Sequence, residues 1–228
     1  MKIAGIIAKW VFILCLPVLL FTASIGWSVN SPWLYGYGFY RHNVSQTTGI
    51  VQSELDRVAR EMVSYFNSGE EYINITVIKD GKQFELLNQK EILHLKDVKE
   101  LIRLDYWLLL GTLIYALGYA GTSLYWRKRR YWRQLACEVV GGSVLTLALM
   151  LALGLGTLFG FDQLFWQFHL ISFTNELWLL DPTRDYLIML FPPELLYDAF
   201  LFWALGTVVL VMVLGGISWN YLRVTRQG

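Results

Sequence analysis

The sequence predicts an α-helical integral membrane protein with four transmembrane helices and a small α+β extracellular cap. Two observations carry this prediction. First, 55% of the 228 residues are hydrophobic and only 16% are charged, whereas soluble domains carry about 25% charged residues. Second, four segments contain the roughly 20 mainly apolar residues that a spanning helix needs: residues 10–27, 106–125, 135–161 and 199–221. The formal net charge of +1 gives no electrostatic reason to expect a nucleic-acid partner.

The first apolar segment is expected to stay in the protein as a membrane anchor. Thr22-Ala23-Ser24 is a small-residue sequence of the kind found at signal-peptide cleavage sites, but the apolar run is long for a signal core. The two cysteines, Cys15 and Cys137, fall in apolar segments. This placement argues against a disulfide framework and against a cysteine nucleophile.

Basic residues next to the spans predict that both termini are cytoplasmic, because cytoplasmic loops are enriched in Lys and Arg. Lys2 and Lys9 precede the first span, and Arg223 and Arg226 follow the fourth. The loop between the second and third spans holds Arg127, Lys128, Arg129, Arg130 and Arg133. The chain is therefore predicted to divide into a first transmembrane helix (1–28), an extracellular cap (29–105), the second and third transmembrane helices with a basic cytoplasmic loop (106–161), an outer aromatic loop (162–198), and a fourth transmembrane helix with a cytoplasmic tail (199–228).

The predicted cap contains one amphipathic helix and one β-hairpin. Ser53-x-x-Asp56 resembles a helix-capping motif. Apolar residues then recur at helical spacing at Leu55, Val58, Ala59, Met62, Val63 and Phe66. Further along, Asp80-Gly81 separates two stretches in which apolar and polar residues alternate, which is a strong hairpin signal.

A second helix is expected to begin at Asn88-x-x-Glu91, where the asparagine is a favourable capping residue. No proline or glycine follows until Gly111, so one helix is predicted to run from the cap into the second span. His94 and Asp97 share a face of this helix because they are three residues apart. Asp97 is therefore a candidate to hold the His94 imidazole in one tautomer.

Two of the three histidines, His94 and His169, lie outside the predicted spans, and acidic residues follow each of them. Histidine can take up and release a proton near neutral pH, so the pair is a candidate catalytic site. Residues 163–173 are predicted to form an interfacial or re-entrant helix on which Phe165 and Phe173 stack against His169. The candidate pocket residues are Phe165, Trp166, Phe173 and Trp178.

These residues also have structural explanations. His94 fits a solvated helix position paired with Asp97, and His169 fits an aromatic position at the membrane interface, where tryptophan and tyrosine also collect. His42 is interpreted as part of the cap structure, and Glu138 is expected to snorkel or to pair with a loop arginine. The sequence contains no Gly-x-Ser-x-Gly, His-Glu-x-x-His or phosphate-binding glycine loop.

A metal site is a further alternative. His94, Asp97 and His169, together with Asp181 or Asp185, have suitable ligand chemistry. The two histidine motifs lie far apart in the sequence and provide no local ligand spacing, so neither a metal nor a cofactor is predicted.

At its two histidine motifs the chain resembles the bacterial lipoprotein intramolecular transacylase family. The order of a span, an outer cap, two spans joined by a basic loop, an outer loop and a last span also matches, so the resemblance covers nearly the whole chain. Leu95 stands where many members have methionine, which is a conservative change. The matching residues are Glu91-x-x-His94-Leu95-x-Asp97-Val98-Lys99 and the block Phe168-His169, Phe173, Asn175, Trp178, Asp181-Pro182 and Asp185.

The resemblance implies an acyltransferase of the bacterial cell membrane that acts on a diacylglyceryl lipoprotein. The sn-2 acyl chain would move to the α-amine of the N-terminal cysteine and give the lyso-form lipoprotein. Because that amine is the nucleophile, no protein serine or cysteine is required. We expect His94 and His169 to divide the general acid and base roles, with the site on the extracellular face next to membrane lipid. Which histidine is the base stays open.

The polar neighbours have supporting roles in this hypothesis. Asn175 is a candidate donor to the tetrahedral oxyanion, and Asp97, with Asp181 or Asp185, is expected to orient the imidazoles. Two other function classes stay open. One is a metal-dependent extracytoplasmic membrane hydrolase, and the other is a non-enzymatic membrane accessory protein.

Overall fold

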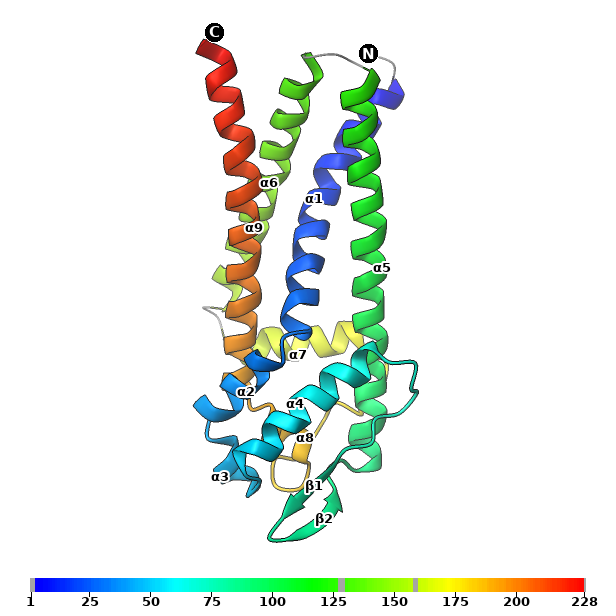
Figure 1. Ribbon diagram of the computed structural model, residues 1–228, viewed down its shortest axis with the longest axis vertical. Helices are drawn as coiled ribbons and strands as arrows, with labels where there is room; N and C mark the ends of the chain where they lie inside the picture. The colour runs from blue at the N-terminus through cyan, green and yellow to red at the C-terminus, as the bar shows by residue number, and fades with distance from the viewer. Residues whose placement is uncertain (1–2, 127–129, 158–159, 228) are drawn as a thin grey trace. The chain divides into compact units, whose positions relative to one another are not determined.

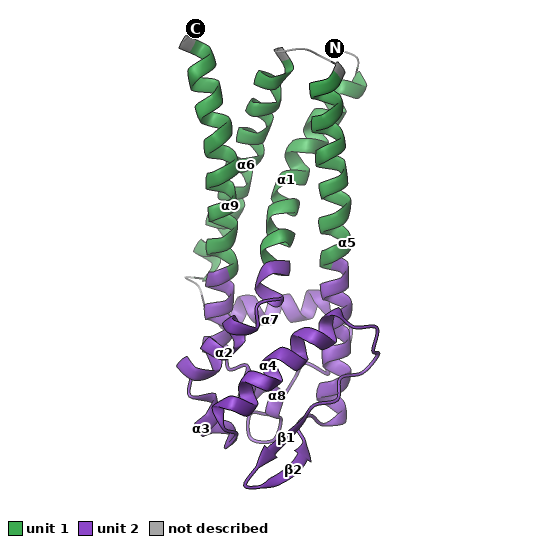
Figure 2. Ribbon diagram, viewed as in Figure 1, with its two compact units in different colours: residues 1–25, 105–158, 203–228 green, residues 26–104, 159–202 purple. Residues whose placement is uncertain are grey.

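The computed structural model describes residues 3–126, 130–157 and 160–227, and these residues are mostly helical. They form two compact units (Figure 2). Unit 1 comprises Met1–Ile25, Asp105–Leu158 and Trp203–Gly228, and unit 2 comprises Gly26–Leu104 and Phe159–Phe202. Four of the basic residues used to predict orientation, Lys2, Arg127, Lys128 and Arg129, lie outside the described residues.

Unit 1 is built from the apolar parts of four helices, α1 (Ile3–Val29), α5 (Gln89–Trp126), α6 (Arg130–Thr157) and α9 (Pro193–Gln227). Each of them is long and apolar enough to cross a membrane, so the prediction of four transmembrane helices is confirmed. Within this unit four helix ends lie at the same end (Figure 1). They are the start of α1, the end of α5, the start of α6 and the end of α9. The predicted third span reaches residue 161, but α6 ends at Thr157 and Phe161 begins another helix.

Two features of unit 1 depend on close contact between helices. A Cβ atom on Gly142 would lie 2.5 Å from the Leu16 side chain, so glycine allows α6 to approach α1. Glu138 is buried, and its carboxylate accepts hydrogen bonds from the Tyr119 hydroxyl at 2.9 Å and the Gln134 amide at 2.8 Å. Glu138 is therefore buried rather than snorkelling, and two neutral donors contact its oxygens. The expected pairing with a loop arginine falls partly on Arg127 and Arg129, which lie outside the described residues.

Unit 2 contains short helices and one hairpin (Figure 1). The elements are α2 (Pro32–Arg41), α3 (Val44–Thr48), α4 (Gln52–Asn67), β1 (Thr76–Lys79), β2 (Lys82–Glu85), α7 (Phe161–Ser172) and α8 (Tyr186–Leu190). The hairpin prediction is confirmed. Lys79 pairs with Lys82 across a two-residue turn, and Asp80 and Gly81 both have positive φ angles, of 53° and 73°, as a type I′ turn requires.

Helix α4 buries most of the predicted apolar stripe, including Leu55, Val58 and Met62. Its start differs from the prediction, because the N-cap is Val51 and Ser53 lies inside the first turn. Asp56 instead accepts a hydrogen bond from the Gln52 amide at 2.9 Å. The expected Ser53-x-x-Asp56 capping motif is therefore wrong.

The predicted start of α5 is confirmed by a reciprocal cap. The Asn88 side-chain oxygen accepts from the backbone N–H groups of Lys90 and Glu91 at 2.9 and 3.1 Å. The Glu91 carboxylate accepts from the Asn88 backbone N–H at 2.7 Å. From this cap a single helix of 38 residues runs to Trp126, as the absence of proline and glycine before Gly111 indicated.

Candidate active site

The two histidine motifs come together in unit 2, although 75 positions separate His94 from His169 in the sequence. His94 lies on α5 and His169 lies in the last turn of α7. Their ring centroids are 6.1 Å apart. Both residues are buried, with 7% and 6% of their surfaces exposed. The explanation of His94 as a solvated surface residue is therefore wrong.

Aromatic rings surround the histidine pair. The Phe173 centroid lies 5.2 Å from that of His94 and 5.5 Å from that of His169. Phe165 lies 4.2 Å from His169, and Trp178 lies 4.9 Å from it. Trp166 packs on Trp178 at 4.7 Å and so supports the wall from behind. The four predicted pocket residues thus line or support one aromatic enclosure, and helix α7 provides two of them.

The hydrogen bonds of the two imidazoles differ. His169 Nδ1 lies 2.8 Å from the backbone oxygen of Phe165. Because a carbonyl oxygen only accepts, Nδ1 carries the hydrogen in the neutral ring and Nε2 presents a lone pair. His94 Nδ1 is buried and, among the described residues, has no hydrogen-bond partner. One histidine is therefore locked in a tautomer, and the other has an unused polar atom inside the site.

Burial keeps both rings neutral near pH 7. The pKa of His94 is lowered from 6.5 to about 4 by burial and, to a smaller extent, by the adjacent His169. Burial also lowers the pKa of His169. His94 lies outside the apolar, membrane-spanning part of α5, which begins 12 positions later at Tyr106. Because the pKa of each ring is lowered, less than half of either imidazole is protonated at pH 6.5, its ordinary pKa.

We predict that nuclear magnetic resonance of imidazole-labelled protein in detergent micelles will show this behaviour. When the pH is lowered from 8 to 6.5, the ordinary pKa of histidine, both the His94 and His169 signals should remain mainly in the neutral form. The His94 signal should stay neutral further, because its pKa is lowered to about 4. Single His→Gln variants will assign the signals. Protonation of either ring above pH 6.5 would contradict the buried, desolvated environment.

Asp97 and Asn175, the two polar residues predicted to support the histidines, contact each other. The Asn175 amide donates to Asp97 Oδ2 at 2.8 Å, and its oxygen accepts from the Leu177 backbone N–H at 3.0 Å. No hydrogen bond joins His94 to Asp97 within the described chain. Asp97 therefore has a hydrogen-bond partner other than His94, and the pair forms a bridge between α5 and the segment after α7. The role of Asn175 as an oxyanion donor stays a prediction.

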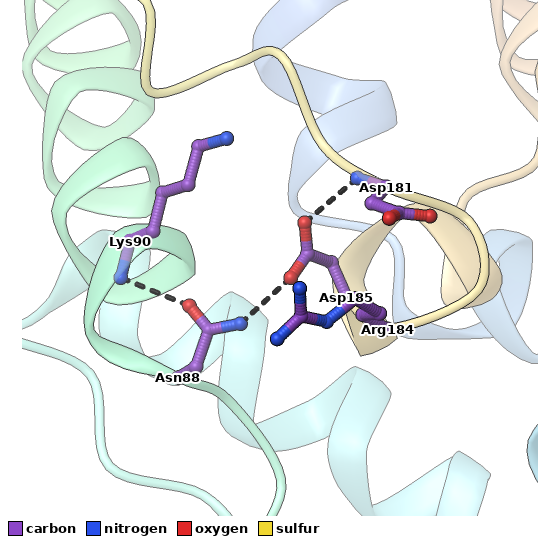
Figure 3. A pocket seen from close by; sticks show the side chains of 5 residues that line it. All are labelled: Asn88, Lys90, Asp181, Arg184 and Asp185. Carbon is purple, nitrogen blue, oxygen red and sulfur yellow. Dashed lines mark hydrogen bonds between the residues drawn. The ribbon is translucent and has the colours of Figure 1, made fainter.

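Asp181 and Asp185 likewise hydrogen-bond to groups other than the histidines (Figure 3). Asp185 is buried and accepts from the Asn88 amide at 2.8 Å and from the Asp181 backbone N–H at 2.7 Å. Asp181 Oδ1 accepts from the Thr183 backbone N–H and hydroxyl. The expectation that one of these aspartates orients an imidazole is replaced by a structural role, in which they shape the 181–185 turn and fasten it to the start of α5.

Glu91 is a residue of this site that the sequence reasoning identified only as a helix cap. It is 1% exposed. Its Oε2 completes the α5 cap, and its Oε1 accepts from the Leu187 backbone N–H at 2.5 Å. Glu91 therefore joins the start of α8 to the helix that carries His94, one turn away from that histidine. Its position three residues before His94 in the matching motif was the available signal.

The predicted ligands of the alternative metal site are not grouped. In the described ranges no cluster of three or more His, Cys, Asp or Glu side chains is arranged to hold a metal ion. Asp97 and Asp185 are engaged with asparagine amides, as given above. The residues that the structure does bring together are the two imidazoles and their aromatic neighbours.

Four apolar helices and a small α+β unit that encloses two buried histidines define a membrane-integral protein of a known architecture. The structure of the membrane integral lipoprotein intramolecular transacylase Lit from Bacillus cereus superposes with a TM-score of 0.81 and 18% identity, covering 100% of this chain and 99% of that one. Two variants of that protein, in which one histidine is replaced by arginine or by alanine, give TM-scores of 0.75 and 0.76, each at 18% identity. Both matches cover 97% of this chain, and they cover 92% and 95% of the variant chains. The comparison with curated proteins gave no match.

Residues 10–195 match the family described as lipoprotein intramolecular transacylase Lit. The chain belongs to this family and is an acyltransferase. The resemblance seen at the two histidine motifs is thereby confirmed.

Proposed function

We propose that the chain transfers the sn-2 acyl group of a diacylglyceryl lipoprotein to the α-amine of its N-terminal cysteine, giving the lyso-form lipoprotein. The observation that carries this proposal is the buried pair of neutral imidazoles, 6.1 Å apart. A transfer in which the substrate amine is the nucleophile needs a base for the amine proton and an acid for the leaving glycerol oxygen. Histidine pairs are suited to both tasks.

His169 is assigned the role of base. Its Nδ1–H donates to the Phe165 carbonyl, so the Nε2 lone pair is available to the substrate amine, whose unperturbed pKa is about 7.7–8.0. The amine nitrogen attacks the ester carbonyl carbon and forms the amide C–N bond. The ester C–O bond then breaks, and the proton taken from the amine passes to the glycerol oxygen. Atoms and charge balance without any co-reactant.

His94 is assigned the role of hydrogen-bond partner to the reacting ester. Its buried Nδ1 has no partner among the described residues, and an unsatisfied buried polar atom costs about 1–3 kcal/mol. A neutral ring that donates from Nδ1 to the ester oxygen would recover this cost and stabilise the tetrahedral oxyanion. The two imidazoles thus divide the work, because only His169 is tied to the backbone.

The aromatic enclosure supports transfer over hydrolysis. Phe165, Phe173 and Trp178 contact the His169 ring, and such a wall excludes water that would compete with the amine. Holding the amine against the ester in this enclosure can lower the barrier by about 7–11 kcal/mol through proximity. The protein therefore needs no nucleophile of its own.

We also propose that both termini are cytoplasmic and that the histidine site faces the extracellular side. Among the described residues, Lys9, Arg133, Arg223 and Arg226 flank the apolar segments on the terminal side of the spans. Cytoplasmic flanks carry such residues. This orientation is tested in a chain whose Cys15 and Cys137 are replaced by alanine and in which a single cysteine is placed at Arg133 or at Glu85. Each variant is labelled with a membrane-impermeant thiol reagent. Only the cysteine at Glu85 should react in intact cells.

The proposed reaction is tested in vesicles that contain the purified protein and a mixture of two synthetic diacylglyceryl lipopeptides with different acyl chains. Each product should keep the mass of its substrate, because the transfer is an isomerisation, and tandem mass spectrometry should place one acyl chain on the α-nitrogen. No chain should cross between the two peptides. Loss of a fatty acid, especially loss that a chelator abolishes, would instead indicate a metal-dependent hydrolase. Crossover would contradict an intramolecular transfer.

A further inference from the structure

A polar pocket of about 330 Å³ lies in unit 2 between the start of α5 and the 181–185 turn. It is lined by Asn88, Lys90, Asp181, Arg184 and Asp185 (Figure 3). Protein contacts occupy three of these side chains. Asn88 and Asp185 hydrogen-bond to each other, and the Lys90 ammonium donates to the Leu179 backbone oxygen. Across the described ranges the Arg184 guanidinium forms no hydrogen bond and no ion pair within 4 Å, although its charge acts on the Asp181 carboxylate. Of the two Asp181 carboxylate oxygens, only Oδ1 accepts hydrogen bonds from the described part of the protein. The pocket therefore presents one unused guanidinium and one unused carboxylate oxygen.

The pocket lies at a defined place along α5 relative to the histidines. Lys90 precedes His94 by four residues, so the two share a face of the helix about 6 Å apart along its axis. The charge of Lys90 acts on His94, which is consistent with this proximity. The apolar part of α5 begins at Tyr106, on the other side of His94. The order along the helix is polar pocket, histidine and apolar segment.

A lipoprotein substrate has the same order of chemical groups. The polar peptide is attached to the lipidated cysteine, which carries the amine and the glyceryl ester, and the acyl chains extend from the glyceryl group. If the amine and ester meet the histidines and the chains follow the apolar segment, the peptide is directed toward Lys90 and Arg184. We propose that this pocket binds the main chain of the lipoprotein directly after its lipidated cysteine, with Arg184 donating to a peptide carbonyl and Asp181 Oδ2 accepting from a peptide N–H. This inference rests on the proposed function.

The charges of the pocket favour a peptide over an anionic lipid head group. Two cations, Lys90 and Arg184, are balanced by two carboxylates, Asp181 and Asp185. An anion would meet both carboxylates, and like charges placed together are repulsive. A peptide unit is uncharged and carries one donor and one acceptor, which match the two unused groups. A main-chain site of this kind accepts many sequences, because every residue other than proline offers the same two groups.

The test compares two substrates in vesicles, with transacylation followed by mass spectrometry. One is a diacylglyceryl-cysteine carboxamide that ends after the cysteine, and the other carries a short neutral peptide in its place. The ratio of kcat/KM for the peptide substrate to that for the short substrate should fall about tenfold in Arg184→Ala, mainly through KM, because one hydrogen bond from a charged donor is lost. Asp181→Asn should lower the ratio less, because its amide keeps an acceptor oxygen.

Arg60→Ala is the matched control, since Arg60 is an exposed arginine of α4 that does not line the pocket; it should keep the wild-type ratio. An unchanged ratio in Arg184→Ala would overturn the inference. The inference would also be overturned if Arg184→Ala lowered kcat/KM for both substrates and this loss disappeared when anionic phospholipid was omitted from the vesicles. That result would assign Arg184 to a lipid head group. If the wild-type protein acylates neither amine, the proposed function fails, and that outcome is distinct from a failure of the pocket.

Discussion

His169→Gln is expected to lower kcat for lipopeptide transacylation by about 10²–10⁴-fold, the usual contribution of a general base. The glutamine side chain occupies a similar volume and still forms hydrogen bonds, but it cannot take up the amine proton. Because the His169 Nδ1–H is bound to the Phe165 carbonyl, the effect belongs to the loss of Nε2 as a proton acceptor. It is measured in vesicles from the initial rate of α-amide formation at saturating lipopeptide.

The same substitution at the two other histidines separates catalysis from folding. The His42 Nε2–H donates a hydrogen bond to Asp198 Oδ2 at 3.0 Å. No described ring contact joins His42 to the aromatic enclosure, and His42→Gln should keep a kcat close to that of the wild type. His94→Gln should lose less than His94→Ala, because an amide N–H can still donate to the ester. A His169→Gln protein that works at the wild-type rate would refute the assignment of His169 as base. Elution as a single species in detergent confirms that each variant is folded.

Glu91→Ala is expected to destabilise the protein by about 3 kcal/mol and to lower kcat at the same time. The change leaves two backbone N–H groups, those of Asn88 and Leu187, without the carboxylate that accepts their hydrogen bonds. The Leu187 N–H is buried and the Asn88 N–H is partly buried, and a buried donor left without a partner costs about 1–3 kcal/mol. Leu187 lies in the first turn of α8, two residues after Asp185, so its release is also expected to loosen the 181–187 segment. Thermal unfolding in detergent measures the first effect and single-turnover transacylation the second.

Glu100→Ala provides the matched comparison for Glu91. Glu100 lies on the same helix, but it is exposed, and its one ion pair among the described residues is with Arg103 at i+3. Such surface pairs contribute little. Its removal should leave the unfolding temperature and kcat nearly unchanged. Glu91→Gln should fall between the two, because an amide satisfies one of the two N–H groups. If Glu91→Ala unfolds at the wild-type temperature, Glu91 does not join α5 to α8 in the way described.

Local features of the sequence predicted several elements correctly. The Asp80–Gly81 turn, the Asn88–Glu91 cap and the buried stripe of α4 all depend on residues within one or two turns of each other. The Ser53 cap was predicted wrongly for a related reason. A Ser-x-x-Asp pattern is compatible with several starting positions, and the contact of Gln52 with Asp56 is equally local, so the pattern alone does not select between them.

Long-range polar contacts could not be predicted in this way. Asp97 was expected to hold His94, and Asp181 or Asp185 was expected to hold an imidazole. The structure instead pairs Asp97 with Asn175 and Asp185 with Asn88, across 78 and 97 positions of sequence. A carboxylate will accept from any donor that the fold brings near it. Residue type therefore indicates that Asp97 needs a partner without indicating which one.

The sequence by itself determined the membrane class, the four apolar helices, the hairpin and the two histidine motifs, because hydrophobicity and turn chemistry act over short stretches of chain. Only the tertiary structure decided that the two imidazoles are neighbours, that the Phe165 carbonyl fixes the tautomer of His169, and that Glu91 joins α5 to α8. Those facts depend on α7 and the segment after it folding back against α5. That arrangement results from packing and hydrogen bonding among residues far apart in the chain, which no local pattern records.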